Sequence, residues 1–251
     1  MLTFKHRTIP MLALATAGCL WGTGFFFGKV ALSEMPVATM ILFRLAFTCA
    51  GLVPAILFDR PHFEGSELGW LFAASVLGVP VLFLVQFKGL SLTTVSHASL
   101  MVGTLPMLLA VAAVVFSRER LHVGGWLALV ASTVGAGLIA LSGNRASGTA
   151  HATVQGDLLV VLSMLAAIAW ILISKRLMRG HSALIVTASV FWIGTIMLAV
   201  VILTAFGVPS LQYSTRAWVA VAEQGLFATA SATVLWNGDS SGFPHLTREF
   251  S

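Results

Sequence analysis

The sequence predicts an all-α integral membrane protein, and composition and patterning both support this. Of the 251 residues, 58% are hydrophobic and 9% are charged, whereas a soluble domain has about 25% charged residues. The apolar residues fall into runs long enough to cross a bilayer, and short polar joints separate most of these runs. Together these features predict a bundle of membrane-spanning helices.

The clearest run extends from Leu92 to Phe116, has His97 as its only ionisable side chain and is followed by Arg118. At ~1.5 Å rise per residue, a helix of this length exceeds the ~30 Å hydrocarbon layer of a bilayer. Pro106 near its middle removes one backbone donor. In lipid such a break is tolerated only where neighbouring helices or a polar cavity satisfy the freed carbonyl, so we place this helix inside the bundle.

An apolar run from Pro10 to Leu32 predicts the first helix. It follows Lys5 and Arg7, as the apolar part of a signal peptide would, but it exceeds the about 7–15 apolar residues of a signal peptide. We therefore expect this helix to be retained. Seven further spans are expected at about 36–58, 68–88, 91–116, 121–142, 156–178, 183–207 and 215–237.

The Lys and Arg residues predict the orientation. With a cytoplasmic N-terminus, the cytoplasmic face carries Lys5, Arg7, Arg60, Arg118, Arg120, Lys175, Arg176, Arg179 and Arg248. The opposite face carries Lys29, Lys88, Arg145 and Arg216. Because cytoplasmic loops of membrane proteins carry an excess of positive charge, we expect a multi-pass protein with both termini in the cytoplasm.

Weak internal repetition divides the chain into two units. Lys29 and Lys175 end corresponding helices, and Trp70 and Trp218 lie near the starts of two others, 148 positions apart. Since the first unit has an odd number of helices, the second enters the membrane from the opposite side, which is the inverted repeat of many secondary transporters. The predicted organisation is 5 + 3 transmembrane helices: five in residues 1–142, a linker loop at 143–155 and three in 156–237.

Several short motifs follow one another along nearly the whole chain: Gly18 to Lys29, Phe43-Arg44, Leu105-Pro106, Glu119-Arg120-Leu121, Gly135-Ala136-Gly137 and Gly156 to Leu159. In their order and spacing the chain resembles the EamA-type permeases of the drug/metabolite transporter (DMT) superfamily. The resemblance implies two five-helix halves, 5 + 5 in all, that move small metabolites, often outward, across the bacterial inner membrane.

The end of the chain departs from that pattern. Residues 238–251 are polar, and no counterparts of the fourth and fifth helices follow in the second unit. Two hypotheses therefore stand. The chain is a secondary transporter of small organic metabolites, such as amino acids or drug-like compounds, working by alternating access. Alternatively, it is a truncated, non-transporting fragment, or a half-transporter that a second copy or another chain completes.

Two charged residues and one amide inside the spans are candidate substrate-binding groups. Arg44 lies too deep for easy escape to water, and a charge there costs ~2.5–3.5 kcal/mol, so it should face a cavity or pair with an acid such as Glu34. Glu223, with Gln224 beside it, lies in the first half of the last span. A carboxyl group within a span can load and release a proton, which would support proton coupling. The alternative places Glu223 at headgroup level.

Five uncharged or aromatic candidates complete the set. Gln86 and His97 can bind substrate or hydrogen-bond a neighbouring helix. Trp21 and Trp170 lie nearer the middle of their helices than interfacial tryptophans do, and could line a central cavity together with Pro106.

Other classes of protein find little support. The sequence has no glycine-rich phosphate loop, His-Glu-x-x-His motif or Gly-x-Ser-x-Gly motif, so we expect no enzyme, cofactor or metal site. The formal charge of +5 is spread between apolar runs rather than gathered in a stripe, which argues against nucleic acid. The expected partners are the lipid bilayer and a small-molecule substrate.

Overall fold

The computed structural model describes residues 5–58, 62–103, 105, 108, 124, 126–127, 130–131, 134–135 and 153–235. The elements assigned in these residues are helices: α1 (Lys5–Leu32), α2 (Val37–Phe58), α3 (Gly65–Val76), η1 (Leu77–Val81), α4 (Leu82–Leu92), α5 (Val95–Gly103), α8 (Val154–Leu177), α9 (Ala183–Phe206), α10 (Thr215–Gly225) and η2 (Leu226–Ser231). The prediction of an all-α protein is confirmed.

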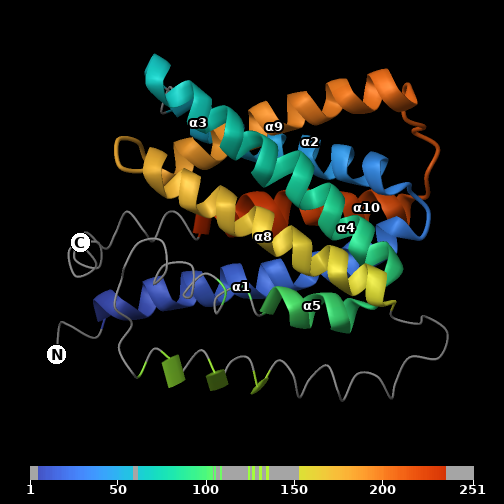
Figure 1. Ribbon diagram of the computed structural model, residues 1–251, viewed down its shortest axis with the longest axis horizontal. Coiled ribbons are helices and arrows are strands. Elements are labelled where there is room, and N and C mark those ends of the chain that lie inside the picture. Colours follow the sequence, from blue (N-terminus) through green and yellow to red (C-terminus); the bar gives the residue numbers. More distant parts are fainter. Residues whose placement is uncertain are drawn as a thin grey trace.

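Four helical stretches of the described residues are long and apolar enough to cross a membrane: Val37–Leu57, Gly65–Leu92, Val154–Leu177 and Ala183–Phe206. Each matches an expected span within a few residues. Helix α1 and the rod formed by α10 and η2 lie beside them (Figure 1). Most of the expected spans 91–116 and 121–142 falls outside the described residues.

Two predicted boundaries were wrong. The third span was expected at 68–88, but its helix begins at Gly65, because Glu64 and Glu67 form a capping box, and it continues to Leu92. The fourth was expected to begin at residue 91, but α5 begins at Val95. The cause is the extended backbone of Thr93, with φ −131° and ψ −178°, which interrupts the helix between them.

Two of the continuous helices contain a π-helical segment: η1 lies between α3 and α4, and η2 follows α10. Segment η1 contains Pro80, which has no N–H to donate. Segment η2 has no proline, and the hydroxyls of Thr229 and Ser231 donate to carbonyl oxygens five residues earlier, at 2.7 and 2.8 Å. Segments of this kind occur frequently at functional sites.

The helices pack in a pattern that repeats itself. Helix α1 packs on α10, and α8 packs on α3 and α4; α2 packs on α10, and α3 packs on α9; α2 and α9 pack on each other. Figure 1 shows these helices running roughly along the long axis of the molecule, with α3 and α4 lying alongside α8. Exchanging α1, α2 and α3–α4 with α8, α9 and α10 maps the first contact of each of the first two pairs onto the second, and maps the contact between α2 and α9 onto itself.

Glycines allow the closest crossings. A Cβ at Gly225 would overlap the Arg44 carbonyl oxygen and lie 2.5 Å from Phe47 Cβ. A Cβ at Gly194 would lie 2.5 Å from Val79 Cβ. Small residues let membrane helices approach closely enough for van der Waals packing to hold them together. Gly225 thus fixes the distance between α2 and α10.

Replacing Gly225 with alanine should destabilise the bundle, because the backbone of α2 cannot move aside as a flexible side chain could. Overpacking of this kind costs about 1–3 kcal/mol. Gly69 is the control, since a Cβ there meets nothing within 4 Å among the described residues, and Gly→Ala within a helix is otherwise favourable. In detergent, Gly225→Ala should unfold at a lower temperature than Gly69→Ala; equal unfolding temperatures would contradict the close crossing.

Candidate functional site: a polar cluster between α2 and α10

Arg44 is the centre of a polar cluster inside the bundle. Its side chain is buried, and its Nε and Nη2 donate to Thr229 Oγ1 at 3.3 and 2.9 Å. The guanidinium carbon lies 4.6 Å from the ring centre of Phe83 and 4.9 Å from that of Phe87. Aromatic faces attract a desolvated cation, so α2, α4 and η2 together stabilise this charge.

The π-helical segment places the acceptor for Arg44. Thr229 accepts from the guanidinium and donates its own proton to the Gln224 carbonyl oxygen at 2.7 Å. Nearby, Thr48 Oγ1 donates to the Arg44 carbonyl at 3.0 Å and lies 3.2 Å from the Gly225 carbonyl. The backbone of α10 is therefore bonded to α2 at the point where the charge is buried.

Glu223 supplies a negative charge beside this cation. Its Oε1 accepts from Thr23 Oγ1 at 2.6 Å, which joins α10 to α1. Its Oε2 is buried without a hydrogen-bond partner in the described part of the chain. The carboxylate is near enough to stabilise the charge on Arg44. Glu34, the acid considered as a partner of Arg44, instead accepts hydrogen bonds from Ser214.

Gln224 is fully buried, and neither its Nε2 nor its Oε1 has a hydrogen-bond partner among the described residues. The absence of a side chain at Gly28 makes room for it: a Cβ there would lie 3.0 Å from Gln224 Nε2 and 2.6 Å from Phe87 Cε1. A buried amide without partners is costly. Such a group is available to a ligand.

Trp170 extends the cluster through aromatic contacts. Its indole fills the space above Gly78, where a Cβ would lie 2.6 Å away. The ring packs edge-on against Phe191, with centres 6.4 Å apart, and Phe191 in turn packs on Phe83 at 6.2 Å. Its Nε1 is buried with no hydrogen-bond partner in the described residues. Trp170 thus reaches Arg44 through two rings.

Among the eight predicted site residues, the structure brings together Arg44, Glu223 and Gln224, with Trp170 beside them. Gln86 is buried on α4, one residue before Phe87. Trp21 lies on α1 and is 42% exposed. Pro106 lies outside the described residues.

His97 belongs to a separate polar group at the end of α4. Its Nδ1 lies 3.2 Å from Asp157 Oδ2, which links α5 to the first turn of α8. Thr93 also donates to Asp157, and Lys29 Nζ donates to the Leu90 carbonyl at 2.8 Å and the Thr93 carbonyl at 2.7 Å. These bonds hold α1, α4, α5 and α8 together at the C-terminal end of α4.

Sequence reasoning missed Thr23, Thr229 and the two phenylalanines of α4. A threonine or phenylalanine within an apolar run gives no signal of its own, since both are common in membrane helices. The π-helical segment that directs Thr229 toward Arg44 contains no proline and could not be found from the sequence.

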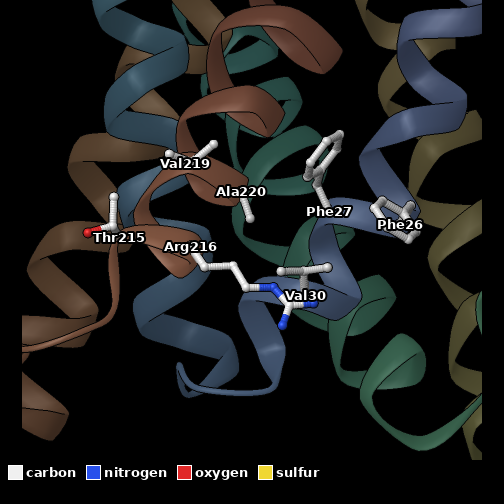
Figure 2. Close-up of a pocket in the computed structure, with 7 residues that line it drawn as sticks. All are labelled: Phe26, Phe27, Val30, Thr215, Arg216, Val219 and Ala220. Carbon is white, nitrogen blue, oxygen red and sulfur yellow. The ribbon is translucent and has the colours of Figure 1, made fainter.

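A lateral pocket of about 330 Å³ lies between α1 and α10. It is lined by Phe26, Phe27 and Val30 of α1 and by Val219 and Ala220 of α10, and Figure 2 shows the Arg216 side chain extending toward Val30. The pocket walls are mostly apolar, and Arg216 in the first turn of α10 is the charged residue that lines them. None of the predicted site residues lines it.

Four apolar helices of membrane-spanning length among the described residues, packed around a buried arginine and polar groups without partners in that part of the chain, define an α-helical membrane protein with a polar centre. The sequence profile of the EamA-like transporter family matches residues 8–141, more than half of the chain. The chain therefore belongs to the EamA-like transporter family, and the resemblance found in its motifs is confirmed.

Relatives of the chain agree with this assignment. An uncharacterized transporter of Archaeoglobus fulgidus is 26% identical over 241 residues, in a match that covers 92% of this chain and 81% of the relative. The uncharacterized transporter YetK of Bacillus subtilis is 24% identical over 246 residues, covering 92% and 72%. A protein of known crystal structure shares the fold, with a TM-score of 0.62 at 20% identity over 92% of this chain and 78% of its own.

Replacing Thr229 with valine, which has the same shape but no hydroxyl, should leave the Arg44 guanidinium without its acceptor. Loss of a partner for a buried charged group costs about 1–3 kcal/mol or more. Thr229→Ser keeps the hydroxyl and is the control. The apparent unfolding temperature in detergent should fall for Thr229→Val and change little for Thr229→Ser; equal shifts would show that the hydrogen bond does not matter.

Proposed function

We propose that the chain is a secondary carrier of small organic metabolites that bear a carboxylate, working by alternating access in the bacterial inner membrane. The observation that supports this proposal is that the buried Arg44 guanidinium has a single hydrogen-bond acceptor among the described residues. A guanidinium has five N–H donors, and the hydrogen bonds of Arg44 in the described residues go to one hydroxyl oxygen. A carboxylate accepts two parallel hydrogen bonds from such a group, so it is the chemical group that Arg44 suits best.

The neighbouring groups favour a substrate with a second polar function. Gln224 offers both a donor and an acceptor, and Glu223 has one oxygen without a partner among the described residues. An ammonium group on the substrate would complement Glu223, as an amino acid would. The aromatic side chains of Phe83, Phe87 and Trp170 supply apolar walls, which are typical of small-molecule sites.

The packing supports alternating access. The contacts that α1, α2 and α3–α4 make with the second unit match those that α8, α9 and α10 make with the first, as expected if residues 1–142 and 156–237 are inverted copies. The polar cluster lies between helices of both units. Rocking of inverted repeats about a site at their interface is the mechanism that such architecture favours.

Proton coupling through Glu223 is a further part of the proposal. A monocarboxylate without an ammonium group that binds Arg44 brings a second, uncompensated negative charge next to Glu223, and like charges at short distance in a low-dielectric site repel. Protonation of Glu223 would remove that repulsion. Uptake of a proton with the anion would leave the net charge of the cluster unchanged.

Arg44→Gln should abolish exchange of carboxylate substrates in proteoliposomes. Amino acids and simple monocarboxylates form the test panel, measured by counterflow of radiolabelled substrate. Lys88→Gln, at an exposed position of α4, is the control and should retain transport, while gel filtration checks that both variants fold. Transport by Arg44→Gln at the wild-type rate would contradict the assignment.

An imposed pH gradient should change the rate of transport by the wild-type protein, whereas Glu223→Gln should exchange substrate but ignore the gradient. The measurement is uptake or efflux in vesicles with and without the gradient. If the wild-type protein is indifferent to the gradient, or Glu223→Gln responds as the wild type does, proton coupling through Glu223 is wrong.

A further inference from the structure

Two polar contacts hold the starts of the helical rods that contain π segments. At the start of α10, Glu34 accepts from the Ser214 backbone N–H at 3.1 Å and from its hydroxyl at 2.7 Å. We name this contact the Glu34 latch. Ser214 is also the N-cap of α10 and accepts from Ala217 N–H, so the latch fixes the turn after α1 to the first turn of α10.

The second contact lies at the start of α3. His181, in the turn after α8, has its Nε2 2.9 Å from Glu67 Oε2. The same carboxylate accepts from the Glu64 backbone N–H at 3.0 Å and so caps α3. We name this contact the His181 latch. The ring of Phe63 lies 4.5 Å from the His181 ring, centre to centre, and covers it on one side.

The two latches are counterparts. Glu34 lies 147 positions before His181, and Glu67 lies 147 positions before Ser214. In each latch, a residue in the turn after the first helix of one unit forms a hydrogen bond with a residue at the N-terminal end of the third helix of the other unit. The same spacing separates Gly78 from Gly225, the glycines at the two π segments. One relation between the units therefore accounts for both contacts.

The latches lie at opposite ends of the bundle. Helices α1, α2 and α3 follow one another along the chain and alternate in direction, so the turn after α1 and the start of α3 are at different ends. Figure 1 shows the connection from α8 to α9 at the end where α3 begins, and the connection from α9 to α10 at the other end. Each latch thus ties the two units together at one end.

We propose that the Glu34 latch and the His181 latch are the two gates of the carrier and open in alternation, so that one remains closed while the other is broken. This inference rests on the proposed alternating access. In this structure both latches are closed, and Arg44 is buried between them. The state is therefore occluded.

The geometry links each gate to the centre. The rod gripped by the Glu34 latch carries Glu223, Gln224 and Thr229, which contact α1 and α2 in the polar cluster. The rod gripped by the His181 latch carries Gly78, against which Trp170 packs, and Phe83, which lies on Arg44. Movement of either helix start would change the surroundings of Arg44.

The contacts are also weak enough to open. The Glu34 latch is exposed and the His181 latch is half-buried, and polar or ionic contacts that water can reach contribute little. The hydrogen bonds from Ser214 lower the pKa of Glu34 below its usual value, and Arg216 adds to the effect. The contribution of this contact is therefore present above the ordinary carboxyl pKa and is lost as the pH falls through the lowered value, so the Glu34 latch is intact at neutral pH.

Pulsed electron paramagnetic resonance can follow both gates in one protein. Cys19 and Cys49 are the only cysteines of the chain, so a cysteine-free background is accessible. One label pair, at Ser33 and Gln212, spans the Glu34 latch; another, at Ser66 and Arg179, spans the His181 latch. All four positions are exposed. Glu34→Ala and His181→Ala break the latches and leave the capping groups Ser214 and Glu67 in place.

Glu34→Ala should populate longer distances for the Ser33/Gln212 pair and leave the Ser66/Arg179 pair short; His181→Ala should do the reverse. If either variant lengthens both distances, or neither variant changes its own pair, the gates are wrong. Should an alanine variant fail to fold, Glu34→Met and His181→Phe keep most of the side-chain volume, have no polar group that could restore the contact, and serve in its place.

A separate transport assay distinguishes the two proposals. Reciprocal distances in a protein that moves no carboxylate would support the gates and overturn the proposed substrate. Transport with distances that are not reciprocal would overturn the gates and leave the carrier assignment standing.

Discussion

The structure depends on the burial of one positive charge. A guanidinium in the middle of a membrane span costs several kcal/mol unless its donors and its charge are compensated, and Arg44 is compensated by groups that three different helical elements supply. Thr229 accepts its hydrogen bonds, the rings of Phe83 and Phe87 face the guanidinium, and Glu223 lies near it. These groups and Arg44 meet only if α2, α4, α10 and η2 converge at one place.

Close glycine crossings and a π-helical segment make that convergence geometrically feasible. Gly225 allows α10 to touch the backbone of α2, and Gly28 leaves room for the Gln224 amide beside Phe87. The segment that follows Gly225 places Thr229 against Arg44 and lets its hydroxyl bond the Gln224 carbonyl. The centre therefore combines tight backbone packing with polar atoms that have no partner among the described residues, which suits a site that must hold a ligand and release it.

The sequence predicted the four membrane-length helices of the described residues to within a few positions, because a bilayer imposes a minimum length on every apolar run. It also indicated Arg44, Glu223 and Gln224, since polar groups inside such runs are conspicuous. It could not indicate Thr23 or Thr229, whose role comes from helix packing, and it gave no sign of the break at Thr93. The repeat spacing of Trp70 and Trp218 was visible, but the latch residues were not, because Glu34 and His181 differ in chemistry although they occupy corresponding positions.

The central claim is that Arg44 and Glu223 share one polar space, and a double-mutant cycle tests it most directly. Unfolding of the wild type, Arg44→Gln, Glu223→Gln and the double variant in mixed micelles gives the interaction energy between the two side chains. Residues in one charged network couple by about 0.5–3 kcal/mol, and we expect a value in that range, with the double variant more stable than the sum of the single changes implies. Strict additivity would contradict the shared polar centre.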